Sequence, residues 1–140
     1  MLNINQEGGI LKCEIKTNKN QEFINITNLV RDAVRKNDVN DGIVTVFVPH
    51  TTAGITINEN ADPDVVTDML SSLNRRFPVE DGYLHREGNS HAHIKASLMG
   101  SSCSVIVENG KLMLGTWQGI YFCEFDGPRR RNIYVNIIRG

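Results

Sequence analysis

The sequence has little of several features that would assign it to a particular class of protein. Acidic and basic residues number 16 and 15, giving a net charge of −1, so no overall field draws the chain to nucleic acid or to an anionic membrane. No apolar run approaches the roughly 18–20 residues that span a bilayer. The first residues lack the basic-then-apolar order of a secretory signal. We therefore expect a cytoplasmic protein with no nucleic-acid or membrane partner.

Cysteine is scarce and scattered. Cys13, Cys103 and Cys123 lie far apart and form no C-x-x-C pair, which argues against a zinc ribbon and against a disulfide framework. Cys13 and Cys123 fall at apolar positions of expected strands and are predicted to be buried. Cys103, in GSSCSV, is expected to be more accessible, but we do not expect it to act as a nucleophile.

The remaining pattern indicates one domain that mixes strands and helices. A chain of 140 residues can bury a core of its own without staples. Residues 10–16, ILKCEIK, alternate with a period of two, and residues 43–48, IVTVFV, form an apolar β-branched run, so both segments are predicted strands. Asn109-Gly110 predicts a hairpin turn, and residues 133–138 predict a central strand or a subunit contact. About seven or eight strands and three helices predict an α+β domain over residues 1–140, mainly an antiparallel sheet or sandwich.

Three segments carry helix signals. Thr27 is predicted to cap a helix over residues 28–37. Asp62-Pro63 predicts the start of a second helix, with a capping carboxylate and proline at the first helical position. Its expected buried stripe consists of Val65, Val66, Met69, Leu70 and Leu73. Residues 91–99 read as a short helix capped by Asn89 or Ser90 and ended by Gly100, and Trp117 is expected in the core or at a subunit interface.

Histidine is concentrated, since three of the four histidines lie between residues 85 and 93 and His50 ends an expected strand. Three imidazoles with one open position are typical of catalytic zinc. If residues 91–99 are helical, His91 and His93 point about 200° apart, so they cannot share one ion. We therefore predict a divalent metal site, expected to hold zinc, formed by His50, His85 and His93, with His91 facing solvent. The alternative is that the histidines are unrelated surface side chains.

Polar side chains near His50 and near the arginine run supply further candidates. Thr51 and Thr52 place two hydroxyls beside His50, and the segment of Asn58, Glu59 and Asp62 precedes a helix. Glu59 is a candidate general acid or base, or else a solvated carboxylate. Asp62 is favoured as a helix cap over a catalytic group. The run of residues 129–131 is usually a solvated edge, although an arginine at a turn, such as Arg129, has the planar fork that recognises phosphate.

Taken together, several motifs resemble one family. The segments PHTTAGITINENADPDV, HREGNSHAHIKASLMGSS, GKLMLGTWQGIYFCEFDGPRRR and YVNI occur in this order. They resemble the YjbQ family, also called UPF0047 or secondary thiamine-phosphate synthase enzymes, over about residues 5–139. The resemblance implies a compact α+β domain, a homotrimer with polar pockets near its subunit interfaces, and a bound metal.

The same resemblance implies an activity and a set of residues. The family is associated with a weak thiamin phosphate synthase activity, which joins a hydroxymethylpyrimidine pyrophosphate to a thiazole phosphate with loss of pyrophosphate. Matching positions are the three proposed metal ligands, the pair Asn58-Glu59, Asp62, Asn89 and the stretch from Glu124 to Arg129. On this basis Glu59, His93 and Asp62 are the expected catalytic residues. The expected contacts to a phosphorylated substrate are Thr51, Thr52, Asn58, Asn89 and Arg129.

Two alternative functions remain open from the sequence. A zinc-dependent hydrolase would use a zinc-bound water with Glu59 as its base. A non-catalytic module would use the histidines only to tie trimer subunits together through a metal ion. The sequence therefore predicts one candidate site and leaves three possible functions for it.

Overall fold

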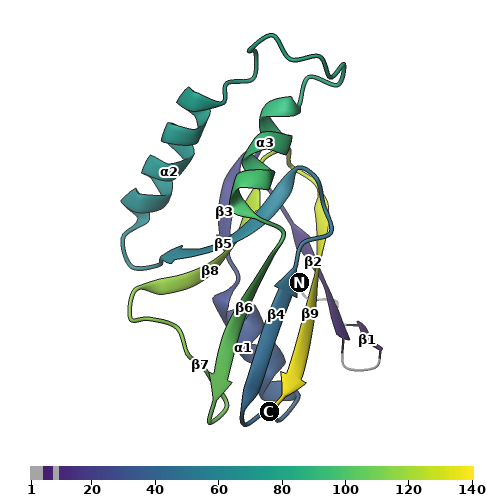
Figure 1. Ribbon diagram of the computed structural model, residues 1–140, viewed down its shortest axis with the longest axis vertical. Coiled ribbons are helices and arrows are strands. Elements are labelled where there is room, and N and C mark those ends of the chain that lie inside the picture. Colours follow the sequence, from purple (N-terminus) through teal and green to yellow (C-terminus); the bar gives the residue numbers. More distant parts are fainter. Residues whose placement is uncertain (1–4, 8–9) are drawn as a thin grey trace.

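The computed structural model describes residues 5–7 and 10–140; residues 1–4 and 8–9 of the predicted domain lie outside the described residues. Nine strands and three helices follow one another along this part of the chain (Figure 1). The elements in chain order are β1 Asn5–Glu7, β2 Ile10–Lys16, β3 Glu22–Asn25, α1 Thr27–Lys36, β4 Gly42–Phe47, β5 Ala53–Glu59, α2 Pro63–Arg76, α3 Ser90–Met99, β6 Ser102–Glu108, β7 Lys111–Leu112, β8 Gln118–Glu124 and β9 Arg130–Arg139. None of the helices in this described part is long and apolar enough to cross a membrane.

Six strands form one antiparallel sheet in the order β1-β2-β9-β4-β6-β7. β9 occupies a central position, pairing with β2 on one side and with β4 on the other, which confirms that residues 133–138 form a central strand. The period-2 pattern of β2 buries Leu11, Cys13 and Ile15 and leaves Lys12 and Lys16 exposed. Alternation along the sequence therefore decides which face of this sheet meets the core.

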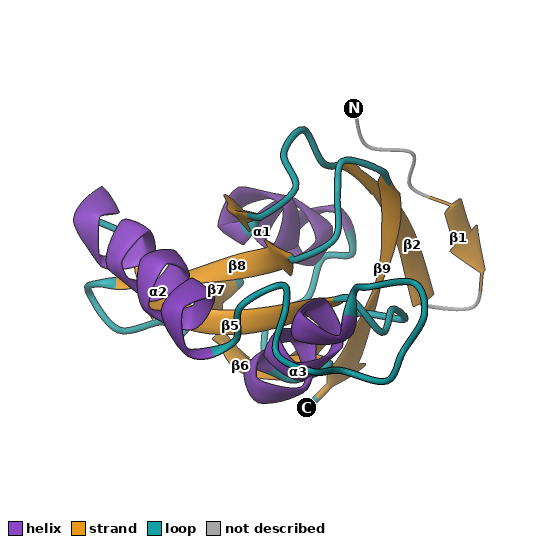
Figure 2. Cartoon of the chain, turned by 90° about the horizontal axis from the view of Figure 1, so that it is seen from above, coloured by secondary structure: helices purple, strands orange, loops and turns teal. Residues whose placement is uncertain are grey.

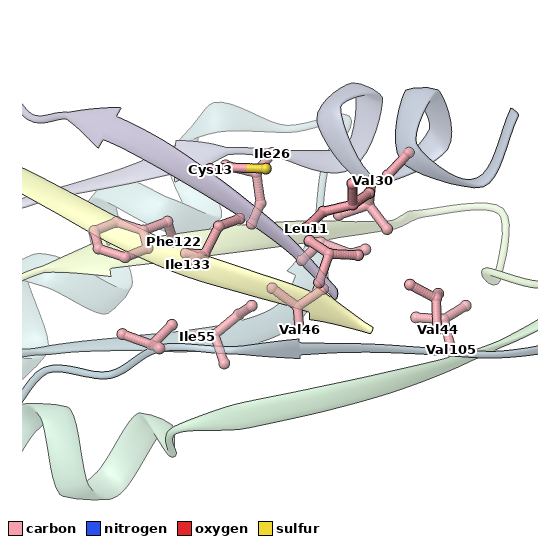
Figure 3. Close-up of a cluster of buried hydrophobic side chains, with 14 of the residues drawn as sticks. Leu11, Cys13, Ile26, Val30, Val44, Val46, Ile55, Val105, Phe122 and Ile133 are labelled. Carbon is pink, nitrogen blue, oxygen red and sulfur yellow. The ribbon is translucent and has the colours of Figure 1, made fainter. Parts of the chain in front are cut away.

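The second sheet has the order β3-β8-β5 and packs against the inner face of the first (Figure 3). Valines of β4 and β6 meet Ile55 of β5 and Phe122 of β8 in this core. Val30 and Val34 of α1 join the same cluster. The prediction of a single α+β domain built as a mainly antiparallel sandwich is thus confirmed.

The start of α1 differs from the sequence prediction, because Thr27 is the first helical residue rather than its cap. The cap position is Ile26, and it makes no side-chain capping hydrogen bond. The Thr27 hydroxyl instead donates to Asn25 Oδ1 at 2.6 Å and accepts from the Ile120 N–H at 2.9 Å. The hydroxyl is thus used to join the helix to β8.

The helices α2 and α3 lie on the outer face of the three-stranded sheet (Figure 2), over a second cluster that includes Tyr121, Cys123 and Phe125. Asp62 caps α2 as predicted, because its carboxylate accepts a hydrogen bond from the Asp64 N–H at 2.9 Å. The prediction that the apolar stripe of α2 is buried is correct for the face that it names but overestimates the burial. No residue of α2 is fully buried. The stripe residues are half-buried because α2 covers only one margin of the sheet.

Three smaller predictions have clear outcomes. Asn109 and Gly110 both adopt positive φ in the turn between β6 and β7, as the hairpin prediction requires. Cys13 and Cys123 are buried, as predicted. Burial raises the pKa of the third thiol, that of Cys103, to about 11, so this thiol stays protonated at neutral pH. Trp117 is 64% exposed in this chain, so it does not belong to the core.

Candidate functional site

A cleft of about 500 Å³ opens between α3 and the segment that joins β4 to β5. Its lining consists of His50, Thr51, Ala53, His93, Ala96, Ser97, Gly100 and Ser101. One wall depends on Gly54 of β5, where an added Cβ would lie 2.9 Å from the Gly100 oxygen and 3.2 Å from the Ala96 oxygen. Only glycine therefore lets α3 approach β5 this closely, and the approach brings His93 opposite His50.

His50 is held in one tautomer by the backbone of a distant strand. Its Nε2 accepts a hydrogen bond from the Asn132 N–H of β9 at 2.9 Å. Burial lowers the pKa of His50, and the positive charge of Arg131 lowers it further, so the imidazole is neutral at pH 7. A neutral imidazole that accepts at Nε2 carries its proton on Nδ1. The ring can therefore donate a hydrogen bond through Nδ1.

His93 and His85 form a second pair of imidazoles. Their ring centroids lie 5.5 Å apart with an interplanar angle of 86°, an edge-to-face arrangement. His93 lines the cleft, whereas His85 is exposed in the loop before α3. The structure thus brings His50 and His93 to one cleft and places His85 against His93.

The fit of these three histidines to a zinc ion is poor in this geometry. No group of three or more His, Cys, Asp or Glu side chains is arranged to hold a metal ion within residues 5–7 and 10–140. The Nε2 lone pair of His50 is already engaged by a backbone N–H, and its Nδ1 carries a proton. A zinc ligand must offer a free lone pair, so His50 would have to release Asn132 before it could bind the ion. These three histidines therefore do not form a ready set of metal ligands in the described geometry.

His91 is buried, with 6% of its surface exposed, and the expectation that it faces solvent is wrong. The buried face of α3 consists of His91, Ala92, Lys95 and Ala96. Polar residues occupy half of this face, which is why apolar periodicity could not identify it. Among the described residues, Nδ1 of His91 has no hydrogen-bond partner, and burial followed by the charge of Lys95 lowers the pKa of this imidazole.

The structure does not bring the predicted carboxylates to this cleft. Glu59 ends β5, about 20 Å from Ala53 at the usual rise of a strand, and its carbonyl accepts from the Tyr121 hydroxyl. Asn58 is exposed and accepts from the Glu59 N–H, while Asp62 is engaged as the cap of α2. Within one chain, these three residues form a separate polar segment at the far end of β5.

The two threonines next to His50 differ in their surroundings. Thr51 is exposed and lines the cleft, so its hydroxyl is available to a ligand. Thr52 is 5% exposed, and its hydroxyl accepts from the Arg131 guanidinium at 2.8 Å. Thr52 is therefore part of the supporting structure.

Asn89 and Arg129 meet on one carboxylate beside the start of α3. Asn89 Nδ2 donates to Asp126 Oδ2 at 2.9 Å, and the Arg129 guanidinium pairs with the same oxygen at 3.0 Å. Arg129 also donates through Nε to the Asp126 carbonyl at 2.9 Å, although half of its side chain remains exposed. This network ties the turn between β8 and β9 to α3.

The buried ion pair between Arg131 and Glu124 was not predicted from the sequence. Arg131 and Glu124 are 3% and 0% exposed, and the guanidinium donates to both carboxylate oxygens through Nε at 2.9 and 3.2 Å. Thr17 and the Asp126 N–H complete the bonding of the carboxylate. Burial raises the pKa of Glu124, but the hydrogen bonds from Arg131 and Thr17 outweigh it and give a net lowering.

A signal for this pair was present in the strand pattern. Arg131 shares the phase of Ile133 and Val135, which are both fully buried on the inner face of β9. Treating residues 129–131 as one exposed charge run concealed this alternation. A buried arginine in a strand requires a carboxylate partner. Glu124 is the last residue of β8, the strand that precedes β9 in the sequence.

Comparison with known proteins agrees with this architecture. A family described as "UPF0047 protein YjbQ-like" matches residues 11–140. UPF0047 protein MJ1081 of Methanocaldococcus jannaschii is 54% identical over 129 residues, covering 92% of this chain and 94% of that protein. UPF0047 protein YugU of Bacillus subtilis is 53% identical over 126 residues, covering 89% of this chain and 96% of that protein.

Solved structures give the same result. A YjbQ/UPF0047 family protein of Clostridium acetobutylicum superposes with a TM-score of 0.89 at 64% identity, covering 91% of this chain and 98% of that one. A YbjQ-like protein of unknown function from Sulfolobus solfataricus superposes with a TM-score of 0.89 at 31% identity, covering 100% of both chains. The sequence match and the shared fold together establish that this chain belongs to the YjbQ/UPF0047 family.

Proposed function

We propose that the cleft between His50 and His93 binds phosphorylated small molecules, and that thiamin phosphate synthesis is the reaction it supports. The observation that carries the proposal is the fixed tautomer of His50, whose Nε2 accepts from the Asn132 N–H. Ionised phosphate oxygens accept hydrogen bonds, so a binding site needs donors that keep their protons at neutral pH. Neutral His50 meets this requirement through Nδ1–H.

Other groups around the cleft add to the donor set. The exposed hydroxyls of Thr51 and Ser101 line it, and a volume of about 500 Å³ is in the range of small-molecule sites. Ser97 donates its proton to the His93 carbonyl, so its oxygen is left as an acceptor. The cleft therefore offers several neutral donors, and ligand affinity rests on hydrogen bonding more than on opposite charge.

The reaction fits a site that stabilises a departing anion. The ring nitrogen of the thiazole phosphate uses its lone pair to form a bond to the methylene carbon of the pyrimidine. The carbon–oxygen bond to pyrophosphate breaks, and its electron pair leaves with the pyrophosphate. Preorganised donors such as His50 Nδ1–H stabilise the charge that develops on this oxygen. The Arg129 cation lies near enough to lower the pKa of His50, and it adds to the same field.

We also propose that the chain acts as a homotrimer, as the family resemblance implies. The outer face of the six-stranded sheet carries a row of exposed isoleucines across three strands, in which Ile43 lies opposite Ile106 and Ile138. Phe47, 44% exposed, lies beside Tyr134 on the same face. An apolar surface of this kind is typical of a subunit contact. A neighbouring copy is also the means by which Glu59 or Asp62 could approach a cleft that their own chain keeps distant.

The proposed reaction can be tested with purified full chain and the two phosphorylated precursors. Formation of thiamin phosphate is measured by chromatography, and inorganic pyrophosphate binding is measured by calorimetry. We expect His50→Ala and His93→Ala to lower the rate at least tenfold, and His50→Ala to weaken pyrophosphate binding. The matched control is Ser71→Ala, which removes an exposed hydroxyl of α2 that accepts from Arg75. Wild-type rates in both histidine variants would remove this site from consideration.

The assembly is tested separately by light scattering after size exclusion. Ile43→Asp places a charge at the centre of the isoleucine row, so we expect it to shift the mass from trimer to monomer. Asp32→Asn on the far helix α1 is the matched surface control. A monomeric wild-type chain at micromolar concentration would contradict the trimer and leave the reaction test unaffected.

A further inference from the structure

Lys95 is a fully buried amine in the layer between α2, α3 and the three-stranded sheet. It is 0% exposed on the inner face of α3. Its Nζ donates to Gln21 Oε1 at 3.1 Å and to Asn74 Oδ1 at 2.5 Å. Both acceptors are neutral side-chain amides. Neither carries charge to balance the ammonium.

The charge of Lys95 is uncompensated in this part of the molecule. None of the ion pairs formed by the described residues includes it. Buried lysines are almost always paired with a carboxylate, because an isolated buried charge is costly. Burial accordingly lowers the pKa of this amine. An ammonium has three N–H donors, and the two amides take two of them.

A groove of about 420 Å³ adjoins Gln21, the side chain that accepts a hydrogen bond from this amine. Gln21 lines the groove and also covers Nζ, while Leu70 of α2 lines it one helical turn before Asn74. Gln21 is thus in contact with both the groove and the amine. A ligand that takes the place of the Gln21 amide would meet Lys95 Nζ.

The walls of the groove fit a flat apolar body with polar groups at its edge. Phe23 and Tyr121 present aromatic rings whose centroids are 6.1 Å apart, and Val66 of α2 lines the groove with them. The amides of Asn25 and Asn60 supply its polar side and bond to each other through Asn25 Nδ2 and Asn60 Oδ1.

The charges of the groove select a monoanion. Lys19 and Glu22 also line it, and Glu22 Oε2 accepts from the N–H groups of Asn18 and Lys19. Once the Gln21 side chain is displaced, the ammonium of Lys95 joins Lys19 against Glu22, which leaves one net positive charge. A dianion would exceed this charge and would approach the Glu22 carboxylate.

We propose that this groove is a binding site for a small aromatic carboxylate, whose carboxylate group displaces the Gln21 side chain and pairs with the Lys95 ammonium. The ring of the ligand packs between α2 and the aromatic side chains of β3 and β8. The site is distinct from the His50–His93 cleft and shares no lining residue with it. It therefore stands whether or not the proposed reaction is correct.

The test titrates benzoate into the full chain, followed by calorimetry and by amide NMR shifts, with benzamide as the uncharged ligand of the same shape. We expect benzoate to saturate in the millimolar range or below, to shift residues of β3 and α2, and to bind at least tenfold more tightly than benzamide. Lys95→Met should weaken benzoate at least tenfold, whereas the matched Lys36→Met, at an exposed lysine in the last turn of α1, should change it less than threefold. Equal binding of benzoate and benzamide, or undiminished binding by Lys95→Met, would overturn the proposal.

A second variant keeps the test decisive if Lys95→Met does not fold. Thr67 is exposed at the margin of the groove, so Thr67→Trp fills the groove and leaves Lys95 in place. We expect this variant to fold and to lose benzoate binding. Retained binding, or displacement of benzoate by equimolar inorganic phosphate, would contradict a carboxylate site in this groove.

Discussion

Replacing Arg131 by methionine should lower the free energy of unfolding by about 3–5 kcal/mol, the usual cost of removing one partner of a buried ion pair. The size of the effect follows from the surroundings of Glu124. Its carboxylate is 0% exposed and, among the described residues, would keep just Thr17 and the Asp126 N–H as partners. The Thr52 hydroxyl would lose its donor as well. A variant that replaces both charges, Arg131→Met with Glu124→Leu, should recover most of the loss because no buried charge is left unpaired.

Urea unfolding at pH 7 measures these changes, at one fixed protein concentration because assembly shifts apparent stability. The neighbouring Arg130 is the matched control, since it is 76% exposed and lies 3.8 Å from Glu14. Arg130→Met should change stability by less than about 1 kcal/mol, as is usual for an exposed pair. The reasoning fails if Arg131→Met costs no more than Arg130→Met, or if the double variant is less stable than the single one.

Three further predictions follow from the same contacts. Folding lowers the pKa of His50 and of His91 below the ordinary 6.5, mainly through burial, so the unfolded chain binds protons first as pH falls. Unfolding free energy should therefore decrease from pH 7 to pH 5, and His50→Asn should flatten the curve; an unchanged slope would refute this. Gly54→Ala should cost about 1–3 kcal/mol because its Cβ would overlap the Gly100 carbonyl, and wild-type stability in urea would contradict it. Added zinc should shift the NMR ring signals of His85 and His93 but not of His50, and equal shifts in all three would show that the Asn132 hydrogen bond does not exclude the ion.

The fold could be predicted where the pattern is local. Alternation in β2, the Asn109-Gly110 turn and the Asp62-Pro63 helix start each depend on a few neighbouring residues, and each is found in the structure. The burial of α2 could not be predicted, because an apolar stripe does not say how much of it the rest of the chain covers. The role of Thr27 depends on an N–H of β8, which is far away in sequence.

In the candidate site, too, some features could be predicted from the sequence and others could not. The meeting of His50 and His93 could be expected from the small residues around His93 and from the position of His50 at a strand end. The state of His50 could not, since a backbone N–H from β9 fixes its tautomer. Nor could the burial of His91 and Lys95, because their polarity contradicts the rule by which buried helix faces are recognised.

The central place of β9 has a consequence for how the molecule is made. Residues 130–139 are the last strand in sequence, yet they alone join β2 to β4 within the described sheet. A nascent or truncated polypeptide that stops before residue 130 would hold two unpaired strand edges, each with free N–H and C=O groups and an apolar side. Such edges recruit other chains, so forms that lack residues 130–139 should aggregate more than a chain that contains them.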